Sequence, residues 1–370
     1  MANKWTKQLR AYDDAVDYDY DSFAAENCLY SPSPYFNWMM ANKSHGIPMN
    51  SGLLLFSEMK AGKSLWIYAM ILQMQREDKL KLDMGFKKKD GTKFTKDDQR
   101  HSVVANTELR GQLQHDVFPE IDKDLMTIWD TKNPVEIFDR VEKDLKPMVQ
   151  DGMPLGIYGI DSITKIMGVK RDAADSVSDH LIGDHALTVQ IGMDKLVPFL
   201  KRNKTLFIGT SQVRGNMDAG KYGPKEKMAE SWDVKHAFEY FVSFKRAGAA
   251  EDKVDIEGKT FEDDIKDARD NKIQTGHKVF YKMEGSSLGP QGRSGVSTLD
   301  YNLGLINMHE EIFFLGKNSG IIKTESNNRV FTFNDKKYVG KKECALAIRD
   351  NPKMAEEILT LLKAMDAKRI

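Results

Sequence analysis

Short apolar runs alternate with longer amphipathic segments through the first two thirds of the chain. The runs predict buried strands over residues 53–56, 102–105, 126–129, 155–160 and 205–210. The segments between them predict helices over residues 35–41, 65–75, 134–149 and 186–200. The third of these helices would bury Val135, Phe138, Val141 and Leu145. Strands that alternate with helices are typical of an α/β fold with a mostly parallel central sheet.

The pattern divides the chain into three parts. Residues 1–34 form an N-terminal segment, residues 35–307 contain the α/β core, and residues 308–370 form a small C-terminal α/β unit. The core continues with strands at 240–245 and 277–283, and the last helix is expected over 352–368. A polar, lysine-rich insertion at 79–100 contains the turn signal Asp90-Gly91 and is expected on the surface.

Charge and hydropathy restrict the partners of this chain. The 55 basic and 55 acidic residues balance, so DNA binding would require a local basic surface. No apolar run approaches the roughly 20 residues of a membrane span. We therefore expect no membrane partner and a cytoplasmic location.

A phosphate-binding loop is predicted directly after the first buried strand. Its eight residues are Ser57, Glu58, Met59, Lys60, Ala61, Gly62, Lys63 and Ser64. A strand, a tight loop and a helix in this order direct backbone N–H groups at phosphates, with Lys63 near the β- and γ-phosphates and Ser64 on Mg²⁺. The first position of this motif is normally glycine, and a Gly-Lys-Ser triplet alone also occurs by chance.

Three residues at other strand ends complete a candidate nucleotide site. Asp161 follows the fourth strand and could hold Mg²⁺ through water, although Asp-Ser also caps helices. Glu108 lies past the second strand and could activate a water, although it could also be an exposed loop residue. Gln212 follows the fifth strand and could sense a γ-phosphate.

Several motifs together resemble the RecA-type recombinases, and in particular the phage (UvsX-like) branch of that family. The matching segments are residues 46–64 (GIPMNSGLLLFSEMKAGKS), 103–108 (VVANTE), 159–163 (GIDSI), 182–186 (IGDHA), 205–214 (TLFIGTSQVR) and 333–365. Their order and spacing match the family from about Tyr35 onward. Ser57, the insertion at 79–100 and Glu284 depart from its pattern.

The resemblance implies a RecA-like P-loop ATPase that uses ATP and Mg²⁺. Such proteins form a helical filament on single-stranded DNA, pair it with homologous duplex DNA and exchange strands in recombination and repair. Partners would include further copies of the chain, with residues 1–34 as the oligomerisation segment, and possible additional partners are a mediator and a single-strand-binding protein. Lys282 matches a cation that reaches the neighbouring ATP site, and Lys278 and Arg293 are other candidates for this role.

The same resemblance places two DNA-binding loops at about 164–181 and 213–233. Basic side chains there would pair with phosphates, and Tyr222 or Met167 would contact bases. The candidate contacts are Lys165, Met167, Lys170, Arg171, Arg214, Lys221, Tyr222, Lys225 and Lys227. From composition alone, these segments are also compatible with solvated loops of mixed charge.

Two other functions remain open from the sequence. A helicase of the same fold would act as a motor on single-stranded DNA and would unwind duplex without homology. A non-hydrolysing member would bind ATP and assemble on DNA without turnover, and the altered first position of the P-loop favours this alternative.

Overall fold

The computed structural model describes residues 21–110, 116, 118–172, 183–215, 226–229, 232–246, 276–289, 291–300, 304–325 and 329–368. For residues 171–172, 226–227 and 232–233 it describes the backbone alone. The first 20 residues of the N-terminal segment and parts of both expected DNA loops lie outside these residues.

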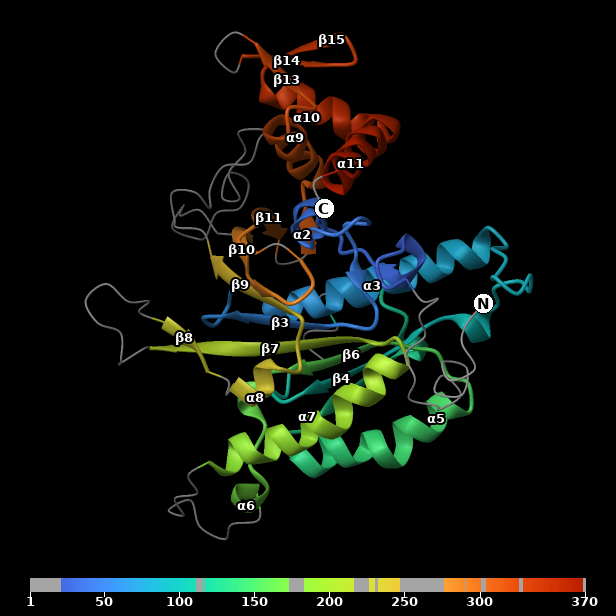
Figure 1. Cartoon of the computed structure of the whole chain (residues 1–370), viewed down its shortest axis with the longest axis vertical. Helices are drawn as coiled ribbons and strands as arrows, with labels where there is room; N and C mark the ends of the chain where they lie inside the picture. The colour runs from blue at the N-terminus through green and yellow to red at the C-terminus, as the bar shows by residue number, and fades with distance from the viewer. Residues whose placement is uncertain are drawn as a thin grey trace, which may run out of the picture.

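A large mixed sheet forms the centre of the molecule (Figure 1). Its parallel part runs in the order β9 (Tyr240–Arg246), β3 (Gly52–Ser57), β7 (Leu206–Gly215), β6 (Leu155–Asp161), β4 (His101–Asn106) and β5 (Met126–Asp130). Antiparallel strands β10 (Gly276–Ser286), β11 (Ser294–Asp300) and β12 (Gly304–Ile306) extend it beyond β9, and β8 (Glu226–Met228) pairs with β7. The expected α/β fold with a mostly parallel central sheet is confirmed.

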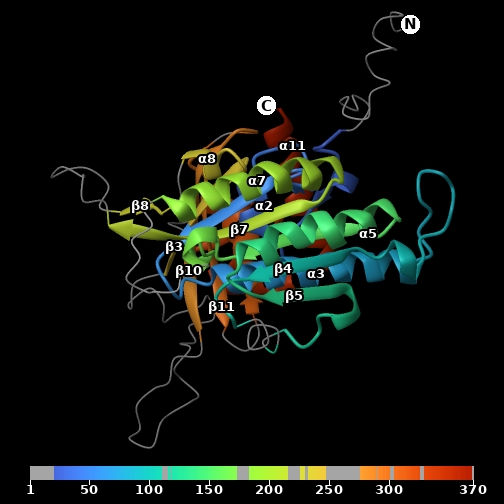
Figure 2. The same cartoon turned by 90° about the horizontal axis from the view of Figure 1, so that it is seen from below.

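Helices cover both faces of this sheet (Figures 1 and 2). Helix α3 (Lys63–Asp83) packs on one face, where Trp66, Ile67 and Met70 join the apolar side chains of β3 and β10. Helix α7 (Asp184–Arg202) and the helical segment from Val135 to Gln150 pack on the other face. The shorter elements are η1 (Ala25–Asn27), β1 (Cys28–Leu29), α2 (Pro34–Met39), β2 (Ile47–Pro48), η2 (Lys96–Asp98), η3 (Lys123–Leu125), η6 (Ile163–Lys165), α6 (Val169–Asp172) and α8 (Trp232–Lys235).

The helix expected over residues 134–149 is present, but most of it is wound as a π-helix and not as an α-helix. It consists of two π-helical segments, η4 (Val135–Asp139) and η5 (Val141–Leu145), followed by α5 (Lys146–Gln150). A π-helix has i→i+5 hydrogen bonds, one residue longer than those of an α-helix. Phe138, Val141 and Leu145 are buried as expected and Ile137 is buried with them, whereas Val135, expected in the core, is 46% exposed.

Residues 21–34, the described part of the N-terminal segment, pack closely on the core of the same chain. Strand β1 pairs with β2, and Leu29 is fully buried in the cluster that also contains Leu53 and Trp66. Helix α2 begins after Ser33, whose hydroxyl accepts a hydrogen bond from the N–H of Phe36. Residues 21–34 therefore pack as part of the core of their own chain. The expected role of residues 1–34 in oligomerisation stays a prediction.

The C-terminal unit lies beside the main sheet (Figure 1) and has its own small core. It contains helices α9 (Met308–Asn318), α10 (Lys341–Asp350) and α11 (Pro352–Ala367), and a sheet of β13 (Lys323–Glu325), β14 (Val330–Phe333) and β15 (Lys336–Val339). Phe313, Phe331 and Ile358 are fully buried together. These side chains explain why the last 60 residues form a compact unit beside the main sheet.

Two buried polar clusters join this unit to the rest of the chain. Glu311 of α9 accepts hydrogen bonds from the Ser33 hydroxyl at 2.7 Å and from the Tyr35 N–H at 3.0 Å. Asp366 of α11 accepts two hydrogen bonds from Arg293, at 2.9 and 3.1 Å, and one from His45 at 3.0 Å. Burial lowers the pKa of His45 to about 4, so its ring donates to Asp366 as a neutral imidazole at neutral pH.

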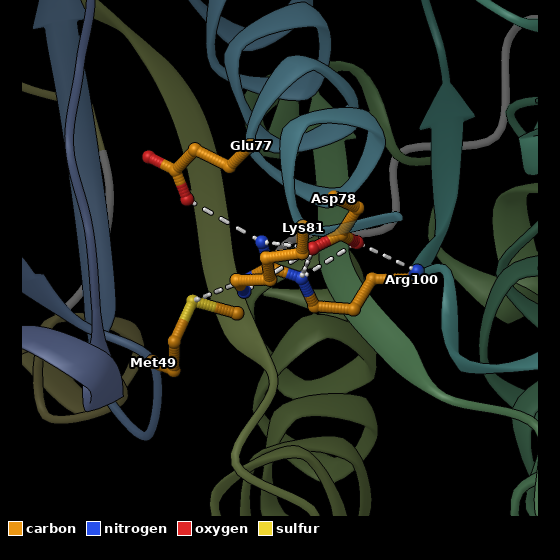
Figure 3. A network of polar contacts seen from close by, with 5 residues as sticks. All are labelled: Met49, Glu77, Asp78, Lys81 and Arg100. Atoms are coloured by element: carbon orange, nitrogen blue, oxygen red, sulfur yellow. Dashed lines mark hydrogen bonds and ion pairs between the residues drawn. The ribbon is translucent and has the colours of Figure 1, made fainter. Parts of the chain in front are cut away.

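An ion pair anchors the insertion at 79–100, which is a mostly exposed surface excursion as expected (Figure 3). Helix α3 continues to Asp83, beyond the predicted end at 75, and Asp78 on its inner face is fully buried. The Arg100 guanidinium donates to both carboxylate oxygens of Asp78 at 2.8 to 3.1 Å, and the Arg100 N–H adds a bond at 2.9 Å. Glu77 and Lys81 lie at the margin of this pair. The two ends of the excursion are therefore held together.

Replacing Arg100 by methionine should lower the free energy of unfolding by about 3 kcal/mol, because the buried carboxylate of Asp78 loses its closest counter-charge and keeps the more distant Lys81. The control is Arg76→Met on the same helix, whose guanidinium pairs with Glu120 at an exposed site; its cost should stay below about 1 kcal/mol. Urea denaturation of both variants measures the difference. Equal effects would show that the Asp78–Arg100 pair contributes no more than a surface pair.

Glu311 makes stability depend on pH near neutrality. Burial raises its pKa to about 7 in the folded protein, above the ordinary value of 4.5. The folded state therefore binds more protons than the unfolded state between these values, and stability falls as the pH rises through this interval. Glu311→Gln should remove that component and stabilise the protein by up to about 3 kcal/mol at pH 8 and little at pH 4.5. Equal unfolding free energies of the variant and the wild type at pH 8 would contradict this assignment.

Candidate functional site: the P-loop and the adjoining sheet edge

The register of four parallel strands brings the predicted site residues to one edge of the sheet. Ser57 at the end of β3 lies opposite Gln212 on β7. On the next strands, Ile160 lies opposite Gly209, and Asp161 opposite Asn106. Because parallel strands end at a common edge, residues that are distant in sequence meet where open α/β sheets bind ligands.

The loop from Ser57 to Gly62 joins β3 to the start of α3. Glu58, Met59 and Lys60 are exposed, whereas Ala61 is buried. Gly62 has a φ of 93°, and an added Cβ would lie 3.1 Å from a methyl carbon of Leu299. Glycine therefore suits this position both by conformation and by space. No side chain caps the N-terminus of α3, which leaves this end suited to an anion.

Lys63 is buried and points back into the loop. Its ammonium donates to the Ser57 hydroxyl at 2.5 Å, to the Glu58 carbonyl at 2.9 Å and to the Ser57 carbonyl at 3.3 Å. Burial lowers the pKa of Lys63, and the carboxylates of Asp161 and Glu108 act in the opposite direction. The positive charge thus lies within the electrostatic reach of both carboxylates.

Asp161 is held in a buried position at the end of β6. One carboxylate oxygen accepts a hydrogen bond from the Thr210 hydroxyl at 2.6 Å. The neighbouring Ser162 and Thr107 exchange hydrogen bonds at 2.7 and 2.8 Å, and the Asp161 carbonyl accepts from the N–H of Thr107 at 2.7 Å. These contacts tie the end of β4 to the end of β6 and fix the carboxylate of Asp161 relative to Glu108.

Glu108 lies just beyond these contacts and is only partly exposed. Its carboxylate forms an ion pair with Arg110, which is largely exposed. Its N–H lies 3.3 Å from the Asp161 carbonyl and donates to it. To act on a water, this carboxylate would have to exchange its contact with Arg110 for a contact with the water. Because Arg110 is exposed, the ion pair contributes little free energy, and its loss is readily offset.

Gln212 continues β7 past the sheet edge. Its N–H donates to the Thr164 hydroxyl at 3.1 Å, and that hydroxyl lies 2.9 Å from the Ser162 hydroxyl. Thr164 therefore connects the strand of Gln212 with the segment that follows Asp161.

Ser64 and Asp161 are the residues that could hold Mg²⁺. A hydroxyl at the helix start and one buried carboxylate suit an ion whose other ligands are phosphates and water. Within the described part of the chain, no three His, Cys, Asp or Glu side chains gather as a metal site of their own. A resident metal held by protein ligands alone therefore has no support among these residues.

Lys282 lies outside this cluster, on the antiparallel part of the sheet. It is opposite Ser243 on β9 and Ser294 on β11, and its ammonium pairs with Glu284 at 2.8 Å. Lys278 lies on the same strand, four residues earlier. Arg293 is engaged with Asp366 and stacks 4.4 Å over the ring of Trp38. Of Lys282 and Arg293, Lys282 has the more exposed and more easily exchanged partner.

A hollow of about 720 Å³ lies beside the sheet edge, between the segment after Asp161, the start of α7 and the end of β7. Its lining residues include the basic side chains Lys132, Lys165 and Arg214. Several basic side chains gathered around one hollow favour an anionic ligand.

The predicted DNA contacts are only partly placed by the structure. Lys165, Met167 and Arg214 line this hollow, and Lys170 is exposed on α6 nearby. Arg171 and Lys227 are described by their backbone alone, and Lys221, Tyr222 and Lys225 lie outside the described residues. The structure thus brings together residues from both expected loops.

Lys132 lines the same hollow and was not anticipated. Lys132 follows β5, and its carbonyl accepts a hydrogen bond from the N–H of Met167 at 2.9 Å. The only signal in the sequence was its place after a predicted strand, which many surface lysines share.

Neither the known protein-family models nor the curated proteins contain a match to this chain. Among the described residues, no helix has both the length and the apolar character needed to cross a membrane.

Proposed function

We propose that this chain is a RecA-type recombinase of the phage branch: a DNA-dependent ATPase that forms a filament on single-stranded DNA and exchanges strands with homologous duplex. The observation that carries the proposal is the meeting of Lys63, Asp161, Glu108 and Gln212 at one sheet edge, beside a basic hollow. The motif resemblance along the chain supports the same reading.

The residues at this edge fit the parts of phosphoryl transfer. Lys63 and the first N–H groups of α3 would bind the β- and γ-phosphates, and Ser64 and Asp161 would hold Mg²⁺. When bound, Mg²⁺ would neutralise charge that develops on the phosphate oxygens. Glu108 would orient a water and accept its proton once its contact with Arg110 has been exchanged.

The proposed link between nucleotide and DNA runs along β7. Gln212 would contact the γ-phosphate, and Arg214, two residues further on the same strand, lines the basic hollow. A shift of Gln212 would also act on Thr164, which lies directly before Lys165. Nucleotide state and affinity for the DNA phosphates would then be linked reciprocally.

Assembly completes the proposal. In a filament, the RecA-like core would contribute both ATP and DNA sites, and residues 1–34 would contact a neighbouring copy. Lys282 would give up Glu284 and reach the neighbour's nucleotide. A mediator and a single-strand-binding protein would act on the same single strand.

ATP hydrolysis should increase strongly when single-stranded DNA is added. Lys63→Ala and Glu108→Gln should each lower the stimulated rate by about a hundredfold or more, because Lys63 would act on the transferred phosphate and Glu108 on the attacking water. The control is Glu120→Gln, at an exposed ion pair away from the site, which should keep the rate. Absence of turnover with every DNA would favour the non-hydrolysing alternative, and unwinding of duplex without homology would favour the helicase.

Single substitutions Lys132→Ala, Lys165→Ala and Arg214→Ala should each weaken binding of single-stranded DNA. Each loss of a phosphate contact should reduce the slope of log affinity against log salt by about 0.7. The control is Lys337→Ala, which removes an exposed lysine of the C-terminal unit and should leave the slope unchanged. Fluorescence anisotropy with an oligothymidylate at several salt concentrations measures the slopes, and three unchanged slopes would remove the hollow from the DNA path.

A further inference from the structure

The departure of the P-loop from its usual pattern has a direct structural counterpart. Ser57 stands at the first position, which is normally glycine, and its side chain is buried at the end of β3. Its hydroxyl donates to the carbonyl of Glu58 at 2.6 Å and accepts from the ammonium of Lys63 at 2.5 Å. A hydroxyl has one proton and two lone pairs, so both contacts can exist at the same time.

These contacts account for every donor of Lys63. An ammonium carries three protons, and the three acceptors are the Ser57 hydroxyl, the Ser57 carbonyl and the Glu58 carbonyl. The two carbonyls belong to the backbone and would be present with any residue at position 57. The hydroxyl is the one acceptor that depends on serine, and it makes the shortest of the three contacts.

We propose that Ser57 is an affinity-determining residue of the nucleotide site, because its hydroxyl holds the Lys63 ammonium in the loop and competes with the phosphates of ATP. This inference rests on the proposed function. The lysine must break its contact with Ser57 to reach a β- or γ-phosphate, and the free energy of that contact is subtracted from nucleotide binding. A relative with glycine at this position has no such cost.

The expected effect follows from the strength of the contact. A hydrogen bond to a charged group contributes more than a neutral one, although Lys63 regains other partners in part. Removal of the hydroxyl should therefore tighten the binding of MgATP by about threefold to thirtyfold. Thermal stability without nucleotide should fall in the same variant, because a buried contact is lost.

The experiment compares Ser57→Ala and Ser57→Gly with the wild type. Both remove the hydroxyl, but only glycine also frees the backbone, so agreement between them identifies the hydroxyl as the cause. The control is Ser51→Ala, which removes a buried hydroxyl just before the other end of β3, where it donates to the Pro48 carbonyl at 2.7 Å. Binding of a fluorescent ATP analogue with Mg²⁺ and without DNA gives the dissociation constants, and Lys63→Ala tests whether binding uses the P-loop.

Each outcome decides the inference. Tighter binding by both Ser57 variants, with Ser51→Ala unchanged, supports it. If the wild type binds through Lys63 but the Ser57 variants bind equally or more weakly, the inference is overturned and the proposed nucleotide site stands. If binding appears only when the hydroxyl is removed, Ser57 blocks the site in the wild type, as proposed. If neither the wild type nor the Ser57 variants bind, both the inference and the proposed function fail.

Discussion

The parallel pairing of β3 with β7 is the constraint on which the arrangement of the site depends. This register places Ser57 opposite Gln212, and the pairing of β7 with β6 then fixes the place of Asp161. A slip of one residue would exchange the two faces of β3, so that Leu53 and Leu55, which pack with α3, would turn toward the α7 layer. The apolar side chains of β3, buried on both faces, prevent such a slip, so the core of the protein also maintains the geometry of its candidate site.

Much of this arrangement could be predicted from the sequence, because buried parallel strands produce short apolar runs that end in polar loops. The strands of the parallel core and the place of Lys63 and Asp161 followed from this pattern. The π-helical winding after Pro134 could not be predicted, because the apolar pattern indicates a helix with one buried face and does not distinguish the two windings. The hydrogen-bond partners of Glu108 and Lys63 also could not be predicted, because the spacing of residues along the chain does not indicate the direction of a side chain.

The C-terminal unit illustrates a second limit of sequence reasoning. The apolar pattern predicted that this unit exists, but it did not predict which contacts join the unit to the rest of the chain. Glu311 and Asp366 would be interpreted as ordinary surface residues on amphipathic helices, yet both are buried in contacts with segments near the N-terminus. Contacts between residues some 280 to 320 positions apart arise from topology, and they join the two ends of the chain across one face of the sheet.

The ion pair that joins the two ends of the excursion after α3 determines how well this chain tolerates insertions in that excursion. Because Asp78 and Arg100 hold the two ends of the excursion together, the length of the connection between them has little influence on the sheet beyond. The turn at Gly91 is exposed on all sides. A fluorescent label or an inserted peptide at this turn would therefore leave the packing of the core unchanged. An insertion that lengthens the chain at this turn should likewise have little effect on the free energy of unfolding.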